Sequence, residues 1–269
     1  MMLLAFGTGY GLKNKIRDKI TAFNGHISIK GFNDNQSNQS LYPIDGNQAF
    51  YPDFEEVPEV IHIQKTATKY GVIRTETDFE GIVVKGISTD YNWSYFDEFI
   101  TQGRKLDLEN NISKEVMMSE YLAKRLGFKL GDKVIIYFLN DNKRKSPPSV
   151  ALTLVGFYNS GFQDCDKQIL MADIRQIIRL NKWEKTQIGE FELIVSDFEN
   201  IENTRIKVYE NIGSFLNAFS IVNEYPTIFE WIKIFDVNIA LIVIIMIIVA
   251  GINMITALLV LILEQTRLV

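Results

Sequence analysis

The stretch VNIALIVIIMIIVAGINMITALLVLIL, from Val237 to Leu263, contains 27 residues without one charge, and 23 of them are Ala, Val, Ile, Leu or Met. As a helix it would be about 40 Å long, at a rise of about 1.5 Å per residue, whereas the hydrocarbon core of a bilayer is about 30 Å thick. Asp236 and Glu264 bracket the stretch. The sequence therefore predicts a transmembrane helix over residues 237–263.

Small and polar residues interrupt this apolar span near its middle. Asn253 and Thr256 lie within one helical turn of each other, next to Gly251. Polar side chains in lipid usually face another helix or a cavity, and glycine lets two backbones approach closely. We interpret Gly251, Asn253 and Thr256 as a helix–helix contact face. The alternative is a span that tolerates one asparagine without any partner.

The rest of the chain has the composition of a water-soluble protein. It carries all 28 basic and 33 acidic residues of the 269-residue sequence. The one cysteine excludes a disulfide framework within the chain and a cysteine-rich metal site, and two histidines 36 residues apart disfavour a histidine zinc site. A net charge of −5 argues against nucleic acid as a partner. The chain therefore reads as a soluble domain attached to a membrane segment.

Two apolar stripes with helical spacing adjoin the membrane segments. Residues 1–11 are expected to be the end of a truncated first transmembrane helix, because no basic region precedes the apolar start. Residues 12–24 then form an amphipathic stalk, and residues 225–236 form a second stalk that enters the span. We predict that the stalks pack together and couple the domain to the membrane helices; the alternative is that each lies on lipid headgroups. The two stripes are Leu12, Ile16, Ile20 and Phe23, and Tyr225, Ile228, Ile232 and Phe235.

Residues 25–224 alternate short strands and helices, which predicts an α+β domain. Ser119 is expected to cap a helix that ends before Gly127, and the polar segment 33–47 is expected to be a mobile loop. The other expected elements are strands at 26–30, 115–118, 133–139, 150–157 and 191–195, a hairpin at 66–87, and helices at 94–101, 173–180 and 202–216, the last with Val208, Ile212 and Phe215 on one side.

Motifs for catalysis and cofactor binding are missing from the sequence. There is no G-x-x-x-x-G-K-[ST] for ATP, no H-E-x-x-H for zinc and no G-x-S-x-G for a serine nucleophile. Cys165 lies between Asp164 and Asp166, but no base or further ligand is near in sequence, so we interpret this segment as a solvated acidic turn. We predict no catalytic residue, no metal and no cofactor.

Five segments, taken in order, carry a family resemblance. They are GTGYGLKNKIRDKITAFNGHISI at 7–29, GIVVKGIS at 81–88, the run 100–139 with Gly103, Ser119, Leu122, Ala123, Leu126, Gly131 and Asp132, LVGFYNSGFQDCD at 154–166, and 249–267 at the end of the span. Together they resemble the FtsX-like, MacB-type superfamily of ABC transporter permeases, and they are most similar to the lipoprotein-releasing permeases of the LolC/LolE type.

The resemblance implies the arrangement of the chain in the membrane. It implies an α+β, MacB-like periplasmic core domain of two lobes, here residues 25–224, inserted between transmembrane helices of the bacterial inner membrane. Four basic residues at 13, 15, 17 and 19 would instead favour a cytoplasmic location, but long domains translocate largely regardless of charge. Permeases of this family have four membrane helices, so we expect a fragment that stops, at 264–269, where the cytoplasmic segment begins.

The same resemblance implies a function. The chain would be a permease subunit that extracts lipoproteins from the inner membrane and passes them to a periplasmic carrier. Its partners would be an ABC ATPase subunit that hydrolyses ATP, a second permease subunit, the lipoprotein, the carrier and membrane lipid. The alternatives are a MacB-like exporter, an FtsX-like regulator of cell-wall hydrolases and, in another class, a membrane-anchored binding or sensor domain. The absent motifs disfavour an anchored enzyme.

Overall fold

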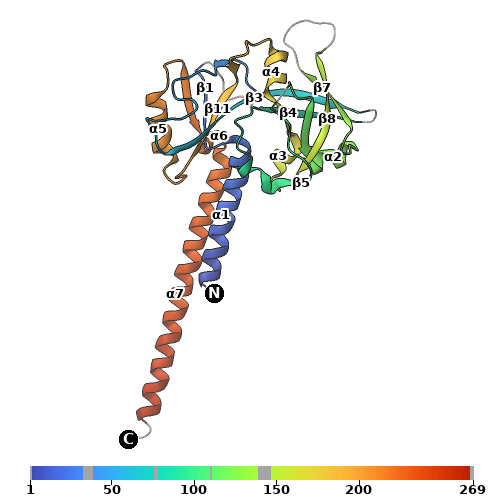
Figure 1. Ribbon diagram of the computed structural model, residues 1–269. Coiled ribbons are helices and arrows are strands. Elements are labelled where there is room, and N and C mark those ends of the chain that lie inside the picture. The colour runs from blue at the N-terminus through green and yellow to red at the C-terminus, as the bar shows by residue number, and fades with distance from the viewer. Residues whose placement is uncertain (1, 33–38, 76–77, 110, 139–146, 267–269) are drawn as a thin grey trace. The chain divides into compact units, whose positions relative to one another are not determined.

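The computed structural model describes residues 2–32, 39–75, 78–109, 111–138 and 147–266 (Figure 1). The chain divides into two compact units. One unit is the domain, Lys19–Glu224, and the other combines the terminal segments Met1–Asp18 and Tyr225–Val269. The first helix, α1 (Met2–Asn24), therefore begins in one unit and ends inside the other.

An antiparallel sheet forms the first part of the domain. Its strands follow the order β12, β1, β11, β3, and the first half of β3 supplies the last position. Helix α5 contacts β12, and the short helix α6 follows β12 directly. The elements are β1 (Ile27–Gly31), β3 (Val60–Arg74), β11 (Glu190–Val195), α5 (Ile201–Asn211), β12 (Leu216–Ser220) and α6 (Ile221–Glu224).

A closed ring of strands forms the second part. Starting from the second half of β3, each strand pairs with the next through β4, β9, β6, β8 and β7, and β7 pairs back onto β3. Ile73, Val84, Met118, Ile136, Leu154 and Leu170, one from each of these six strands, are almost fully buried. The strands are β4 (Phe79–Ile87), β6 (Glu115–Ser119), β7 (Lys133–Phe138), β8 (Ser149–Tyr158) and β9 (Ile169–Asp173), with β5 (Ile100–Gly103) paired to β8 outside the ring.

Strand β3 therefore belongs to both parts of the domain, because its first half pairs with β11 and its second half with β7. This sharing gives the α+β domain its two lobes, and β3 runs through both of them (Figure 1). The hairpin expected over 66–87 is confirmed, because Thr66 pairs with Ile87, and β3 extends beyond it to Val60.

The helix that was predicted to begin after Ser119 and to end before Gly127 is confirmed. Helix α2 (Glu120–Leu126) begins after Ser119, whose Oγ accepts a hydrogen bond from the Leu122 amide at 3.0 Å. It ends at Gly127, which has a φ of 77°. The remaining helices of the domain are α3 (Gln163–Gln168), α4 (Ile174–Asn181) and the 3₁₀ turns η1 (Trp93–Tyr95) and η2 (Asp97–Phe99).

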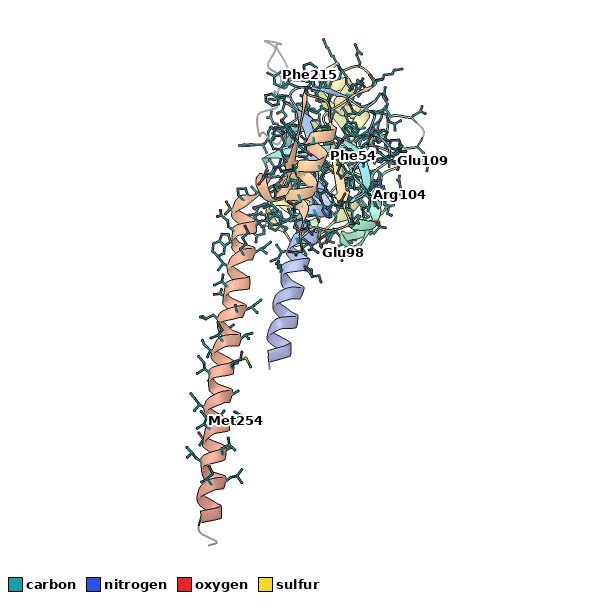
Figure 2. All side chains as sticks on the ribbon, turned by 90° about the vertical axis from the view of Figure 1, so that its left-hand side faces the viewer. Phe54, Glu98, Arg104, Glu109, Phe215 and Met254 are labelled. Carbon is teal, nitrogen blue, oxygen red and sulfur yellow. The ribbon has the colours of Figure 1, made fainter. Side chains whose placement is uncertain are left out.

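One helix prediction was wrong, and another was confirmed except for its C-terminal end. The segment 94–101 forms two 3₁₀ turns and then enters β5. The helix expected over 202–216 ends at Asn211, and Phe215 lies 88% exposed at the surface rather than on a buried face with Val208 (Figure 2). The cause is strand pairing, because the Phe32 amide donates to the Phe215 carbonyl at 2.9 Å and Leu216 pairs with Gly31.

The polar segment 33–47 is only partly a loop. Residues 33–38 lie outside the described residues. Ser40 is buried, and its Oγ accepts a hydrogen bond from the Thr68 amide at 3.0 Å. Strand β2 (Ile44–Asp45) then pairs with β10 (Gln187–Ile188).

The terminal unit contains the long helix α7 (Pro226–Thr266), which runs without a break through the expected second stalk and the expected span. Its part over Pro226–Ile262 is, among the described residues, the one helix long and apolar enough to cross a membrane. Over its 41 residues α7 is about 60 Å long.

Candidate functional site: the roots of the two stalk helices

The last turn of α1 is built into the domain unit. A helix leaves its last four carbonyl groups without partners in the helix, and such groups need other donors when they are buried. Here three of the four, those of Thr21, Ala22 and Phe23, have a donor, and the Ile20 carbonyl just before them accepts a side-chain hydrogen bond as well. The carbonyl of Ile20 accepts from Asn24 Nδ2 at 3.2 Å, that of Thr21 from the Gly25 amide at 2.8 Å, that of Ala22 from the Tyr91 hydroxyl at 3.0 Å, and that of Phe23 from Lys85 Nζ.

Lys85 belongs to a buried ion pair. Its ammonium contacts Glu192 on β11, and both side chains are less than 5% exposed. Glu192 also accepts hydrogen bonds from Gln64 Nε2 at 2.9 Å and Thr66 Oγ1 at 3.2 Å. Burial raises the pKa of Glu192, and the Lys85 ammonium opposes that shift. A cation at this position also complements the negative end of the helix dipole of α1.

Aromatic packing fixes the same turn from another side. The ring of Phe23 is fully buried, with its centroid 5.0 Å from that of Phe96, 5.4 Å from that of Tyr158 and 6.5 Å from that of Phe99. Rings at these separations add stabilisation beyond their buried area. The C-terminal turn of α1 is therefore a part of the domain core, and we call residues 19–26 the first root.

The second root is the segment that leads from β12 into α7, residues 220–224. Glu224 ends α6 and contacts Lys30 on β1 at 2.5 Å, and it accepts a hydrogen bond from Ser28 Oγ at 3.0 Å. Lys30 also lies 3.3 Å from Glu190. Burial lowers the pKa of Lys30, but the two carboxylates outweigh burial and hold that pKa above its ordinary value.

Strand β1 joins the two roots. It starts three residues after α1 ends, and it pairs with β12, so that Ile27 lies opposite Ser220. In addition, the Ile221 amide donates to the His26 carbonyl at 3.0 Å. This hydrogen bond joins the residue after Ser220 to the residue before Ile27. Backbone hydrogen bonds therefore connect the two roots directly.

The residues expected to form the stalk stripes differ in their surroundings. Ile20 and Phe23 are buried and lie in the domain unit. Ile16 is half-buried and Ile232 is buried, both in the terminal unit. Of the others, Tyr225 and Ile228 are half-buried, and the side chains of Leu12 and Phe235 lie outside the described ones. Packing of the two stripes against each other remains a prediction.

The expected helix–helix contact face lies on an exposed part of α7. Met254, beside Asn253, is 62% exposed (Figure 2), and a Cβ added at Gly251 would meet no atom within 4 Å. The Thr256 hydroxyl donates to the Ile252 carbonyl of its own helix at 2.8 Å. A contact of this face with another membrane helix remains a prediction.

The acidic segment around Cys165 is not the solvated turn that we expected. Asp166 is buried, and its carboxylate accepts from the amides of Ser160 and Gly161, each at 3.1 Å, and from Ser160 Oγ at 2.7 Å. Burial, with the nearby Asp166 carboxylate, raises the pKa of the Cys165 thiol to about 12. The segment lies in helix α3 (Gln163–Gln168), and its thiol is neutral at physiological pH.

Sequence reasoning missed the charged residues that hold the two roots in the domain, namely Lys30, Lys85, Glu192 and Glu224. Two signals could have identified two of them. Lys85 interrupts the apolar run Ile82-Val83-Val84, and Glu192 lies inside the apolar strand β11. Charged residues are almost never fully buried unless they are paired, so a charge inside an apolar strand indicates a buried partner.

The sequence matches one protein-family model. That model, which describes the MacB-like periplasmic core domain, matches residues 1–208. Similar solved structures include the extracellular domain of the noncanonical ABC-type transporter YknZ from Gram-positive bacteria, with 12% identity, a TM-score of 0.44, and coverage of 72% of this chain and 99% of that chain.

Two other solved structures are similar to comparable degrees. The periplasmic region of MacB from Actinobacillus actinomycetemcomitans has 14% identity and a TM-score of 0.46, and the alignment covers 80% of this chain and 95% of that one. A domain of a putative permease from Porphyromonas gingivalis has 15% identity and a TM-score of 0.36, with coverage of 74% and 89%. No curated protein sequence matches the chain. Because the family model spans more than three quarters of the residues, the chain belongs to the family with the MacB-like periplasmic core domain, and it is a permease component of an ABC transporter of the MacB/FtsX type.

Proposed function

We propose that this permease extracts lipoproteins from the inner membrane and delivers them to a periplasmic carrier, driven by ATP hydrolysis in a partner ATPase subunit. The observation that carries the mechanical part of the proposal is the direct connection of the two roots through β1. The cargo is the part that follows from the resemblance to lipoprotein-releasing permeases.

The mechanism is mechanical rather than chemical. Helix α7 is continuous from the domain boundary to Thr266, so a displacement at its membrane end reaches the second root as the movement of a rod. The hydrogen bond from Ile221 to His26 and the pairing of β12 with β1 then pass the movement to the first root. ATP-driven movement of the membrane helices would in this way rearrange the domain and the membrane helices together.

A MacB-like exporter of peptides or antibiotics is the second candidate, and the match to the MacB-like domain model favours it. Its coupling path would be the same, because both functions need the membrane helices to move the domain. The two candidates differ in their cargo. A lipoprotein carries acyl chains that must leave the bilayer, whereas an exported peptide or antibiotic need not be attached to lipid.

The proposal can be tested in proteoliposomes. They would contain the permease complex that includes this chain, together with its ATPase. The cargo is a triacylated lipoprotein, and the matched control is the same protein with its acylated cysteine changed to serine. We expect ATP-dependent transfer of the acylated protein to a soluble carrier. ATP-dependent efflux of peptides without lipoprotein transfer would support the exporter, and a complex that moves neither cargo would contradict both.

A further inference from the structure

A polar layer is buried on one face of the first sheet. Strand alternation places Ser28 and Gln64 on either side of Glu192, and it places Thr66 opposite Glu190. Lys85 lies on β4, paired with Thr68, on the same face. Each of these residues except Thr68 is less than 10% exposed, although sheet faces in domain cores are usually apolar.

Two groups of ion pairs on this face of the sheet lie between the two roots, and together we call them the polar ladder. It consists of Glu224, Lys30, Glu190, Glu192 and Lys85. In the first group, Glu224 contacts Lys30 at 2.5 Å, and Lys30 contacts Glu190 at 3.3 Å. In the second group, Glu192 contacts Lys85, which donates to the Phe23 carbonyl at the end of α1. Glu190 and Glu192 are alternate residues of β11, so the backbone of this strand joins the two groups.

Stability alone does not explain five ionisable groups in this position. Removing charges from water is costly, and apolar side chains of similar volume often give an equally stable or more stable core. Hydrogen bonds and ion pairs differ from apolar contacts in having a preferred direction, so they hold two groups in one orientation. The ladder is therefore suited to fixing the orientation of one root relative to the other.

We propose that the polar ladder transmits a displacement of one root to the other, with Glu224 and Lys85 as the positioning residues at its two ends. This inference rests on the mechanical part of the proposed function and adds a path to it. The backbone path ends at His26, whereas the ladder crosses β1 and β11 to β4 and reaches the carbonyl of Phe23. The first root is thus held both at the start of β1 and at the end of its helix.

Hydrogen exchange of the full chain in lipid nanodiscs tests the ladder at a distance. The first variant is Glu224→Gln, which removes a charge from the half-buried end of the ladder. We expect exchange protection in residues 19–26 to fall about fivefold or more, the low end for coupling between distinct sites. Protection in the first half of β8, residues 149–153, should stay unchanged, because this half pairs with β7 in the closed ring, whereas Tyr158 at the other end of β8 packs on Phe23.

The reverse experiment changes the other end. Lys85→Met combined with Glu192→Gln leaves no unpaired buried charge from this ion pair, and we expect it to lower protection in residues 220–224. Arg125→Gln is the matched control, because it breaks an ion pair with Glu80 in the same domain that is outside the ladder. It should change protection at neither root.

Two outcomes would overturn the inference. Loss of protection only at the altered root would show that the ladder does not transmit, and an equal loss at both roots and in the first half of β8 would show a general effect on stability. If the double variant does not fold, Glu224→Gln and Lys30→Gln decide the question by the same criterion. The measurement uses no ATPase and no cargo, so it can fail while transport is observed, and it can succeed while the proposed cargo is wrong.

Discussion

At the scale of single residues, buried carboxylates organise this domain. Asp166 accepts three hydrogen bonds from the turn at Ser160 and Gly161, and its backbone carbonyl accepts one from the Ser119 hydroxyl. Ser119 at the same time caps α2. Two residues from separate segments of the sequence, at 119 and 166, thus meet at one place and hold α2, α3 and the end of β8 together.

Replacing Asp166 by Ala should destabilise the domain by about 2–3 kcal/mol, because buried donors of Ser160 and Gly161 would lose their acceptor. Urea denaturation followed by tryptophan fluorescence measures the change. Asp164→Ala is the control, since Asp164 is exposed and its substitution should alter the free energy of unfolding by less than about 0.5 kcal/mol. Equal effects of the two substitutions would contradict the structural role of Asp166.

At the scale of elements, features formed by residues close together in the chain could be predicted from the sequence, whereas pairings between distant residues could not. The cap at Ser119, the end of α2 at Gly127 and the hairpin of β3 and β4 were predicted, because the residues that form them are neighbours in the chain. Closure of the ring by β7 and β3 was not, since Ile73 and Ile136 are 63 positions apart. The pair of Lys85 and Glu192, 107 positions apart, was missed for the same reason.

Gly103, at the end of β5, is required by a close backbone approach. Its φ is 80°, and an added Cβ would lie 2.2 Å from the Val155 carbonyl oxygen. Gly103→Ala should therefore lower the free energy of unfolding by about 2 kcal/mol or more. Gly81→Ala in β4 is the matched control, because its Cβ would meet no atom within 4 Å, and it should be neutral or slightly stabilising. Thermal unfolding of both variants compares the two positions.

The stalk stripes give a prediction at the same scale. In a Cys165→Ala background, cysteines introduced at Ile16 and Ile232 should form a disulfide rapidly under mild oxidation, because the proposed stalk packing brings these positions together. Lys15, an exposed neighbour of Ile16, provides the control pair with Ile232 and should crosslink slowly. Equal rates for the two pairs, measured by gel shift after oxidation, would favour stalks that lie separately on the lipid surface.

At the scale of the whole molecule, the family assigns the domain to the periplasmic side, whereas the basic residues of α1 suggested the opposite. Glu109 is exposed on the domain and offers a position for a label (Figure 2). The buried Ser40 would be a poor choice, although its polar surroundings in the sequence suggested a loop.

A cysteine at Glu109 should react with a membrane-impermeant maleimide in intact spheroplasts, because we predict that the domain lies outside the cytoplasm. A cysteine at Glu264, in the segment predicted to be cytoplasmic, should react only after lysis. Cys165 is buried and has a raised thiol pKa, so it should contribute little background. The reversed pattern of labelling would contradict the predicted topology and with it the transport function.

The pairing of β1 with β11 and β12 also has a consequence for biosynthesis. Strand β1 ends at Gly31, but its partners begin only at Glu190 and Leu216. At about 5–20 residues per second, a ribosome needs about 10–30 s to make the intervening segment. During this time β1 has no partner strand, and α7 follows soon after β12 is complete. The first sheet therefore cannot be completed until nearly the whole domain has been synthesised.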